Sequence, residues 1–271
     1  MGVLVFFSFI PSQMRITALT YNISWASQKN VAAGSERDLV EMCQHTRVKC
    51  FLNSLRIIND IDNLHLIGLQ EVNTTDIERK IINRSTHLNA YSRGTIGLSS
   101  VSLIWNAQLF GARKHKRVIN LKDGDDRPCL IIETQKGYQL IVAHFPWIDD
   151  RKQLNIVYNI IRTQCFTHTR PTIVLADTND EYTLISREHP FRLGRYELSQ
   201  GMTRKQLKHA LISCCWHEKG HKFKSFASTG DYVLAPSGMM IRNYIPNLYR
   251  DILASDHRPV LADLRIKNTN P

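Results

Sequence analysis

The stretch Pro171-Thr172-Ile173-Val174-Leu175-Ala176-Asp177-Thr178-Asn179-Asp180 is the part of this chain from which its fold is predicted most directly. Its first half is a continuous run of apolar, strand-forming residues, which is typical of a strand buried on both faces of a sheet. The run ends in Asp177, Thr178 and Asn179, so polar groups stand where the strand leaves the sheet and can meet solvent. Asp and Asn also form ordinary turns, so this tip acquires a chemical meaning only if other strands end in the same way.

Other predicted strands do end, or begin, in polar residues. Segment 16–25 alternates like a strand and carries Asn22 near its end, and the apolar run 64–72 carries Glu71. Each tip also has an ordinary structural reading, such as a helix-capping acid for Glu71. Along the rest of the chain, His144 ends a strand predicted at 138–145, Asp231 lies in the segment 230–234, and Asp256-His257 precedes a strand at 259–264.

Helices and further strands are expected between these segments. Ser35 and Asp38 resemble a capping box ahead of an apolar stripe that continues to Ile61, so a long helix is expected to cover one sheet face. Residues 98–145 predict a run of strands, at 98–105, 116–121, 129–134 and 138–145. A polar helix over about 150–165 then connects this run to the strand at 171, which makes a strand, helix and strand unit.

The length and composition favour one domain. A chain of 271 residues that is 43% hydrophobic can bury one large core or two modest ones, and no linker or repeat divides it. We therefore expect an apolar N-terminal extension at 1–13, a single catalytic domain at 14–267 and a short tail at 268–271. The apolar N-terminus is too short to span a bilayer, so no membrane span is expected, and a signal peptide remains the alternative.

Charge and cysteine usage suggest partners and a compartment. The formal net charge of +11 favours a polyanionic partner, either nucleic acid or a phosphorylated small molecule. Segment 181–224 interleaves basic and aromatic residues, which predicts contact with nucleic acid or, equally, a solvated surface. The six cysteines are scattered without a CxxC pair, which favours an intracellular compartment, cytoplasmic or nuclear; their even number keeps secretion as the alternative. The oligomeric state is not readable from the sequence.

The order of the polar tips resembles a known family. Asparagine after a first strand, Gln-Glu after a second, a later histidine, Asp-x-Asn, Asp-Tyr and Ser-Asp-His follow one another as in the endonuclease/exonuclease/phosphatase superfamily. The resemblance covers nearly the whole chain, from Ile16 to Leu264. It implies an α/β (α+β) fold with the DNase-I-like architecture, a four-layer α/β sandwich of two mixed β-sheets packed face to face with helices outside. It also implies hydrolysis of phosphate esters with a divalent metal, usually Mg²⁺, with Mn²⁺ as the alternative.

The resemblance assigns a metal-binding role to three residues of this chain. Glu71 would be the principal ligand, Asn22 would lie beside the metal, and Asp256 would complete the network of metal and water. Carboxylate and amide oxygens suit Mg²⁺, which needs few protein carboxylates because it keeps several waters. A bound cation would offset the negative charge with which a phosphate diester repels a nucleophile.

The resemblance also assigns catalytic roles. Asp177 would activate or position the attacking water, and Asn179 would orient that carboxylate and the phosphate. His144 would bind phosphate oxygens or the leaving group. His257 would contact the scissile phosphate and would be held in orientation by Asp231. Such a site provides a proton acceptor for water and groups that fix an in-line geometry.

The sequence departs from the family pattern at positions that bear on substrate. Ala176 stands where the family usually has glycine, and Ile23-Ser24-Trp25 lacks the glycine of many abasic-site nucleases. Thr178 resembles the tyrosyl-DNA phosphodiesterase branch. The prediction is therefore a nuclease acting on DNA or RNA. The alternatives are a phosphatase for inositol phosphates or other small phosphate esters, a 5′-tyrosyl-DNA phosphodiesterase, and an inactive binding module.

Overall fold

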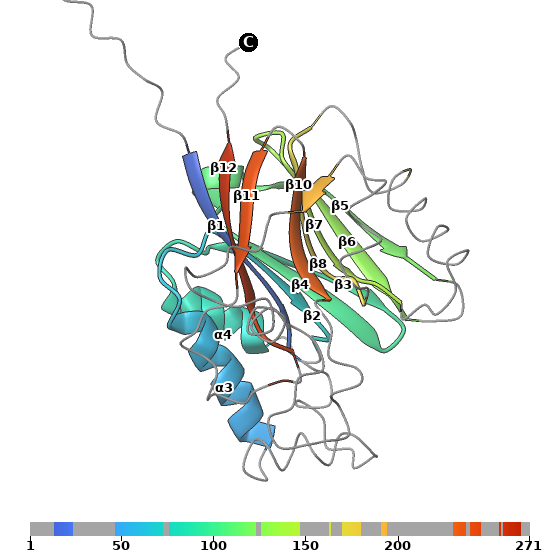
Figure 1. Ribbon diagram of the computed structural model, residues 1–271. Coiled ribbons are helices and arrows are strands. Elements are labelled where there is room, and N and C mark those ends of the chain that lie inside the picture. The colour runs from blue at the N-terminus through green and yellow to red at the C-terminus, as the bar shows by residue number, and fades with distance from the viewer. Residues whose placement is uncertain are drawn as a thin grey trace, which may run out of the picture.

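Two six-stranded mixed β-sheets pack face to face in the computed structural model (Figure 1). The structure describes residues 14–23, 47–72, 76–122, 126–146, 163, 170–179, 191–193, 230–236, 239–244, 255 and 257–266. The sheet sandwich predicted from the sequence is confirmed. Helices α3 (Arg47–Asn59) and α4 (Asp76–Arg84) lie on the outer face of the first sheet, and the short α5 (Ala107–Phe110) follows its strand β4.

The first sheet has the order β11-β12-β1-β2-β4-β3. Strand β1 pairs antiparallel with β12 and parallel with β2, so the sheet is mixed. The parallel pair places the carboxyl ends of β1 and β2 side by side, with Asn22 opposite Gln70. The strands are β1 (Met14–Asn22), β2 (Leu66–Gln70), β3 (Ala90–Ile96), β4 (Ser99–Trp105), β11 (Met239–Tyr244) and β12 (Val260–Ile266).

The second sheet has the order β5-β6-β7-β8-β10-β9 and also contains one parallel pair, β7 with β8. This pair sets His144 opposite Asp177, and the antiparallel pairing of β10 sets Asp231 opposite Asp177. Three residues named from the sequence therefore meet at one edge. The strands are β5 (Arg113–Asn120), β6 (Pro128–Thr134), β7 (Gln139–His144), β8 (Thr172–Asp177), β9 (Phe191–Leu193) and β10 (Asp231–Pro236).

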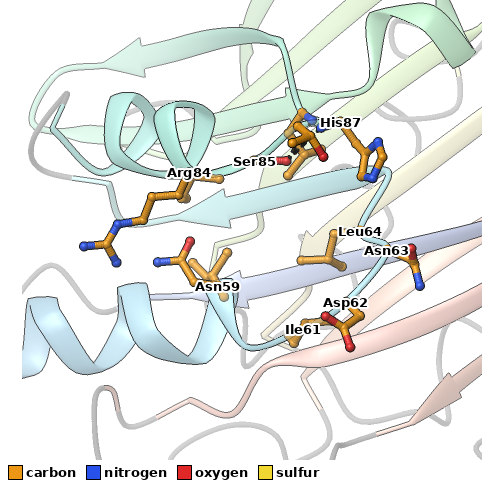
Figure 2. Close-up of a pocket in the computed structure, with 12 residues that line it drawn as sticks. Asn59, Ile61, Asp62, Asn63, Leu64, Arg84, Ser85 and His87 are labelled. Carbon is orange, nitrogen blue, oxygen red and sulfur yellow. Dashed lines mark hydrogen bonds between the residues drawn. The ribbon is translucent and has the colours of Figure 1, made fainter.

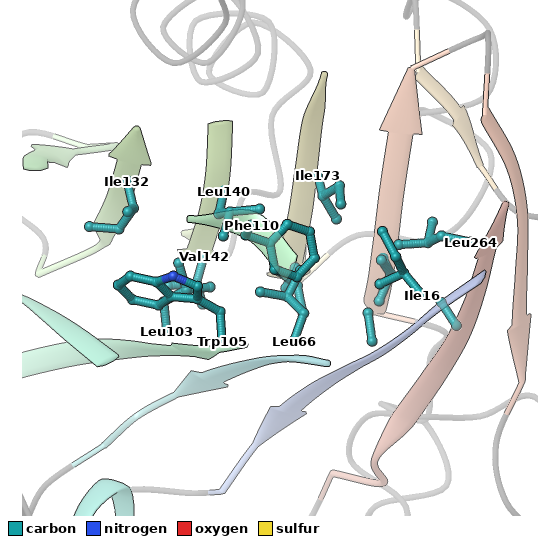
Figure 3. Close-up of a cluster of buried hydrophobic side chains, with 14 of the residues drawn as sticks. Ile16, Leu66, Leu103, Trp105, Phe110, Ile132, Leu140, Val142, Ile173 and Leu264 are labelled. Atoms are coloured by element: carbon teal, nitrogen blue, oxygen red, sulfur yellow. The ribbon is translucent and has the colours of Figure 1, made fainter. Parts of the chain in front are cut away.

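The main core lies between the two sheets (Figure 3). It is built from strand residues that point inward at alternate positions. The central strands are apolar along their length because their outward-facing residues are buried as well. Ring and aliphatic side chains of Trp105, Leu103 and Leu66 face Leu140 and Val142 across the interface. This packing fixes the two sheets relative to one another and so fixes the residues at their edges.

A second cluster fills the space between the first sheet and its helices, where Leu55 of α3 and Ile77 of α4 pack against Ile67 of β2. The outer face of the second sheet is buried as well, around Ile131 and Val174. Of the helix predicted at 150–165, which would form the fourth layer, the structure describes residue 163 alone. No helix in the described part of the chain is long and apolar enough to span a membrane.

Several predicted elements differ from the structure at their ends. The strand predicted at 116–121 begins three residues earlier, at Arg113, because it is an edge strand and needs no apolar face at its start. Of the helix predicted from Ser35, the structure describes the part from Arg47 to Asn59. Strand β3 was not predicted, since its sequence AYSRGTI has no continuous apolar run.

Candidate active site

Polar side chains from both sheets meet at the carboxyl ends of the two parallel pairs. Asn22 is fully buried, and its Nδ2 donates to Glu71 Oε1 at 3.0 Å and to Asp177 Oδ2 at 2.9 Å. One amide thus joins a carboxylate of its own sheet to a carboxylate of the opposite sheet. The three side chains are separated by 49 to 155 positions in the sequence, and only the sheet packing brings them together.

His257 lies on the other side of Asp177. Its Nδ1 is 3.0 Å from Asp231 Oδ2, and its Nε2 is 3.7 Å from Asp177 Oδ2. An ionised carboxylate only accepts hydrogen bonds, so Nδ1 carries the proton and Asp231 fixes the orientation of the ring. The predicted pairing of Asp231 with His257 is therefore present as a contact, and it turns Nε2 toward Asp177.

Ser255 holds the turn that delivers His257. Its Oγ donates to the carbonyl of Asn22 at 2.8 Å and accepts from the backbone N–H of His257 at 3.1 Å. The hydroxyl therefore ties the segment before β12 to the end of β1. Asp256, which was predicted to complete the metal network, lies outside the described residues.

His144 approaches Asp177 and Glu71 from β7. Its Nε2 is 3.6 Å from Asp177 Oδ2 and 3.7 Å from Glu71 Oε1, and it is 2.8 Å from Arg127 Nη1. A guanidinium can only donate, so the Nε2 that contacts Arg127 accepts in this arrangement. Arg127 thus brings a fixed positive charge to His144, the ring that lies between it and the two carboxylates.

Asn179 is placed by backbone contacts. Its N–H donates to Asp177 Oδ1 at 3.0 Å, and its Nδ2 donates to the carbonyl of Phe145 at 2.7 Å. The first contact is an Asx turn, as expected from an ordinary loop. The same turn therefore holds a candidate site residue. Asn179 therefore holds the Asp177 carboxylate and the end of β7 in position.

Two candidate residues have a left-handed backbone. Asn179 has a φ of 48° and Glu71 a φ of 57°. Asparagine adopts this region fairly often, whereas a glutamate there costs roughly 1–2 kcal/mol. Residues held in such conformations cluster at functional sites. At Glu71 the turn directs the carboxylate toward Asn22 and His144, with 27% of the side chain exposed.

Burial raises the pKa of Asp177. The carboxylate is fully buried, and desolvation of its charged form is the largest cause of the shift; the nearby Asp231 carboxylate adds to it. His257, His144 and the amide of Asn22 act in the opposite direction. The site thus concentrates negative charge in a buried place, which a cation would stabilise.

The donor set suits a hard divalent cation. Carboxylate oxygens of Glu71 and Asp177 converge on the side-chain amide of Asn22, and Mg²⁺ prefers carboxylate oxygens. Ligand atoms of Asp177, Asp231 and His257 also lie within 4.8 Å of one another. In that second group Asp231 and His257 are hydrogen-bonded to each other, and Mg²⁺ has little preference for imidazole. The observed contacts therefore favour the Glu71 side of the site for Mg²⁺.

A cavity of about 270 Å³ lies elsewhere, between the ends of α3 and α4 and the loop before β2 (Figure 2). Asn59, Asp62, Arg84 and His87 are among its lining residues, and none of the residues predicted for the site contributes to it. It is near the amino end of β2, whereas Glu71 follows the carboxyl end. The cavity is therefore separate from the chemistry described above.

Two residues of the site were not predicted from the sequence. Arg127 precedes β6, and Ser255 precedes β12, so each lies next to a strand like the residues that were predicted. Ser255 begins the Ser-Asp-His series quoted from the sequence, which assigned it no role, whereas nothing around Arg127 indicated its contact with His144. Arg127 becomes recognisable only when the pairing of β6 with β7 places it beside His144.

The chain is similar to known proteins at the level of structure. No protein-family model matches the chain, and no curated protein matches it. An endonuclease/exonuclease/phosphatase from Bacteroides vulgatus superposes with a TM-score of 0.62 at 14% identity, covering 94% of this chain and 100% of that one. TDP2 from C. elegans superposes with a TM-score of 0.58 at 15% identity, covering 93% of this chain and 75% of that one.

A humanized D. rerio TDP2 with 14 mutations is also similar, with a TM-score of 0.58, 12% identity and coverage of 92% of this chain and 98% of that one. These matches span nearly the whole chain, and they agree with the sheet order and with the fold that the sequence predicted. The chain therefore has the DNase-I-like fold of the endonuclease/exonuclease/phosphatase proteins.

Proposed function

We propose that this protein is a divalent-metal-dependent phosphodiesterase that hydrolyses nucleic acid. The observation that carries the proposal is the surrounding of one buried carboxylate, Asp177, by an amide and two imidazoles. Asn22 lies at 2.9 Å, His144 at 3.6 Å and His257 at 3.7 Å from the same oxygen. Such a group combines a proton acceptor with several groups that can bind a phosphate, as hydrolysis of a diester requires.

Asp177 acts as the base in this proposal. The carboxylate takes a proton from the attacking water, and its raised pKa makes it a stronger base than an exposed aspartate. Asn22 and the backbone N–H of Asn179 each bind one of its oxygens, which fixes the direction from which water is deprotonated. Mg²⁺ held by Glu71 and Asn22, with Asp256 as a further proposed ligand, would supply positive charge to the phosphate oxygens.

His257 binds the scissile phosphate through Nε2. The Asp231 carboxylate stabilises the protonated imidazole, and this ring can then place a positive charge on a non-bridging oxygen. His144 and Arg127 bind the phosphate from the other side of Asp177. A phosphate oxygen that enters beside His144 comes within reach of Arg127, whose planar guanidinium suits two oxygens at once.

Nucleic acid is the substrate class that the charge favours. The chain carries a net charge of +11, which attracts a polyanion more strongly than a small ester. Thr178 does not favour a tyrosyl-DNA substrate, because it is buried and both its N–H and its Oγ1 donate to the carbonyl of Gly230 at 2.7 Å. Its identity is explained by this contact.

A cleavage panel with Mg²⁺ tests the proposal. It contains plasmid, single-stranded DNA, RNA, an abasic duplex, a 5′-tyrosyl oligonucleotide and inositol phosphates. We expect the wild type to cleave a polynucleotide, Asp177→Asn and EDTA to abolish cleavage, and Asp62→Asn to leave it unchanged, since Asp62 is exposed and remote from the site. Phosphate release from inositol phosphates alone would establish the small-ester alternative. Absence of cleavage of every substrate by the wild type would refute hydrolysis and favour a binding module.

A further inference from the structure

Strand β5 carries a continuous row of basic side chains. Arg113, Lys114, His115, Lys116 and Arg117 follow one another, and all are exposed. The strand is an edge strand of the second sheet, at the end opposite β9 (Figure 1). Edge strands often carry a lysine that prevents pairing with another chain, and one or two charges suffice for that purpose. A row of this length exceeds what edge protection requires.

The row extends over both faces of the sheet. Lys116 pairs with Ile132, which belongs to the core between the sheets, and Arg117 pairs with Ile131, which belongs to the outer cluster. Because directly opposite residues in an antiparallel pair share a face, Lys116 and Arg117 project to opposite sides. A polyanion can therefore contact positive charge from either side of the edge.

The acid that strand pairing sets beside the row is engaged mainly with another residue. Glu133 pairs with His115, but its carboxylate is 2.5 Å from Arg170, and the hydrogen bond from Arg170 is the largest cause of the lowered pKa at Glu133; the charges of His115 and Arg117 make smaller contributions. In the described part of the chain, no acidic side chain forms an ion pair with Lys114 or Lys116. The positive charge of these lysines is therefore available to a ligand.

The strand leads to the candidate active site. Its last residue, Asn120, accepts from the backbone N–H of Arg127 through Oδ1 at 3.2 Å, and Arg127 reaches His144. The pairing of β5 with β6 and of β6 with β7 puts the carboxyl end of β5 at the same edge as His144. The basic row at Arg113–Arg117 therefore points along β5 toward Arg127, with the uncharged Val118, Ile119 and Asn120 between them.

We infer that β5 binds the phosphate backbone of a polynucleotide whose scissile phosphate lies at Asp177, an inference that rests on the proposed function. The five basic residues, at about 3.3 Å each, make the row about 16 Å long. One strand of a duplex presents a phosphate about every 3.4 Å along the helix axis, so the row matches roughly five phosphates. A small phosphate ester has nothing that could use this length.

The test is binding in the presence of EDTA, which prevents cleavage. Fluorescence anisotropy is measured with labelled oligonucleotides of four and twenty nucleotides, as DNA and as RNA, over a range of salt concentrations. The test variant is Lys114→Gln with Lys116→Gln. The matched control is Arg79→Gln with Arg84→Gln, which removes the same charge from exposed positions on α4, on the first sheet's outer face.

We expect the β5 variant to lose roughly five- to tenfold in affinity per lysine for the twenty-nucleotide probe near 0.1 M salt. The slope of log affinity against log salt concentration should become shallower by about 0.7–0.9 per lysine. The loss should be smaller for the four-nucleotide probe, and the α4 control should bind like the wild type. Equal losses in both variants, or none in the β5 variant, would overturn the inference whether or not cleavage is seen.

The same proteins are then assayed for Mg²⁺-dependent cleavage. Normal length-dependent binding without hydrolysis of any diester by the wild type would overturn the proposed function and leave the binding surface standing. Vesicles that contain anionic phospholipid serve as a further probe. If these vesicles bind in a β5-dependent manner and the oligonucleotides do not, the surface recognises a membrane and the inference is wrong.

Discussion

Asp177 is the residue at which stability and the proposed activity conflict. Burial raises the pKa of its carboxyl above the ordinary 3.8, so the folded chain holds this proton more tightly than the unfolded chain does. The free energy of unfolding therefore falls as pH rises from 3.8 through the raised pKa, and it stays lower above that pKa. A carboxylate kept at this cost is typical of a residue retained for its chemistry.

Asp177→Asn should accordingly stabilise the protein at neutral pH while it abolishes hydrolysis. An amide keeps the shape and can still accept from Asn22, but it carries no buried charge. We expect a gain of about 0.5–2 kcal/mol in EDTA, or roughly 1–8 °C in Tm. Thermal unfolding between pH 4 and 8 measures the gain in Tm over wild type, and this gain should vanish toward pH 3.8. A lower Tm at pH 7 would show that burial of this charge is not destabilising.

Arg127 should matter to turnover more than to folding. It is only partly buried, and its contact with His144 brings charge to the phosphate side of the site. We expect Arg127→Ala to lower kcat/KM on an oligonucleotide by roughly a hundredfold or more, as the loss of a transition-state donor does. Arg127→Lys should recover part of this, because it restores charge without the planar fork. A Tm that falls with activity in both variants would point to a structural role.

At the scale of elements, the parallel pairs β1–β2 and β7–β8 create the site. Each pair sets two strand ends side by side, and the residues immediately there are Asn22 with Gln70 and His144 with Asp177. Strands of this kind could be predicted, because each is an apolar run with a polar end. Edge strand β3 could not be predicted in this way, because most of its side chains are exposed or half-buried and it has no continuous apolar run. The left-handed backbone of Glu71 was equally invisible, since nothing in the residue type indicates it.

Gly68 shows how closely the two pairs approach one another. A Cβ at Gly68 would lie 2.5 Å from Leu175 Cβ of β8 and 3.2 Å from Val142 Cγ2 of β7. Glycine is therefore required in the middle of β2, where a strand would otherwise favour a larger side chain. The contact sets the distance between the strand that carries Glu71 and the strand that ends in Asp177.

Gly68→Ala should destabilise the protein by about 1–3 kcal/mol through overpacking, and it should lower activity because β2 must move away from β8. Gly137→Ala is the matched control. Its φ of 82° makes alanine unfavourable by roughly 1–2 kcal/mol, but no atom lies within 4 Å of the added Cβ. Urea unfolding and initial rates measure both effects. Full activity in Gly68→Ala would mean that the spacing of the sheets does not control the site.

At the scale of the molecule, the candidate site is a junction between the two sheets. Asn22 and Glu71 come from the first sheet, whereas His144, Asp177 and Asp231 come from the second. The order of the polar tips predicted this convergence and the sandwich itself. It could not predict that a single amide, Asn22, would join both sheets, because that contact depends on how the sheets pack.

A cation bound at this junction should stabilise the whole sandwich. It would bind the folded protein and not the unfolded chain, in which Glu71 and Asp177 are far apart. At a hundred times its Kd, Mg²⁺ should add about 2.7 kcal/mol, or roughly 5–11 °C in Tm. It should also make the stability less dependent on pH, because a cation near Asp177 lowers the pKa of that carboxyl and so opposes the effect of burial.

Glu71→Gln should remove most of the stabilisation by Mg²⁺. The substitution deletes the charge of the most exposed of the three carboxylates Glu71, Asp177 and Asp231, and it leaves an oxygen that can accept from Asn22. Asp62→Asn, which removes an exposed acid at the far end of β2, should keep the full shift. Thermal scans with and without Mg²⁺ compare the two variants, and Ca²⁺ in place of Mg²⁺ tests the size of the site. Equal shifts in both variants would place the cation outside this junction, and the proposed role of Glu71 would then be wrong.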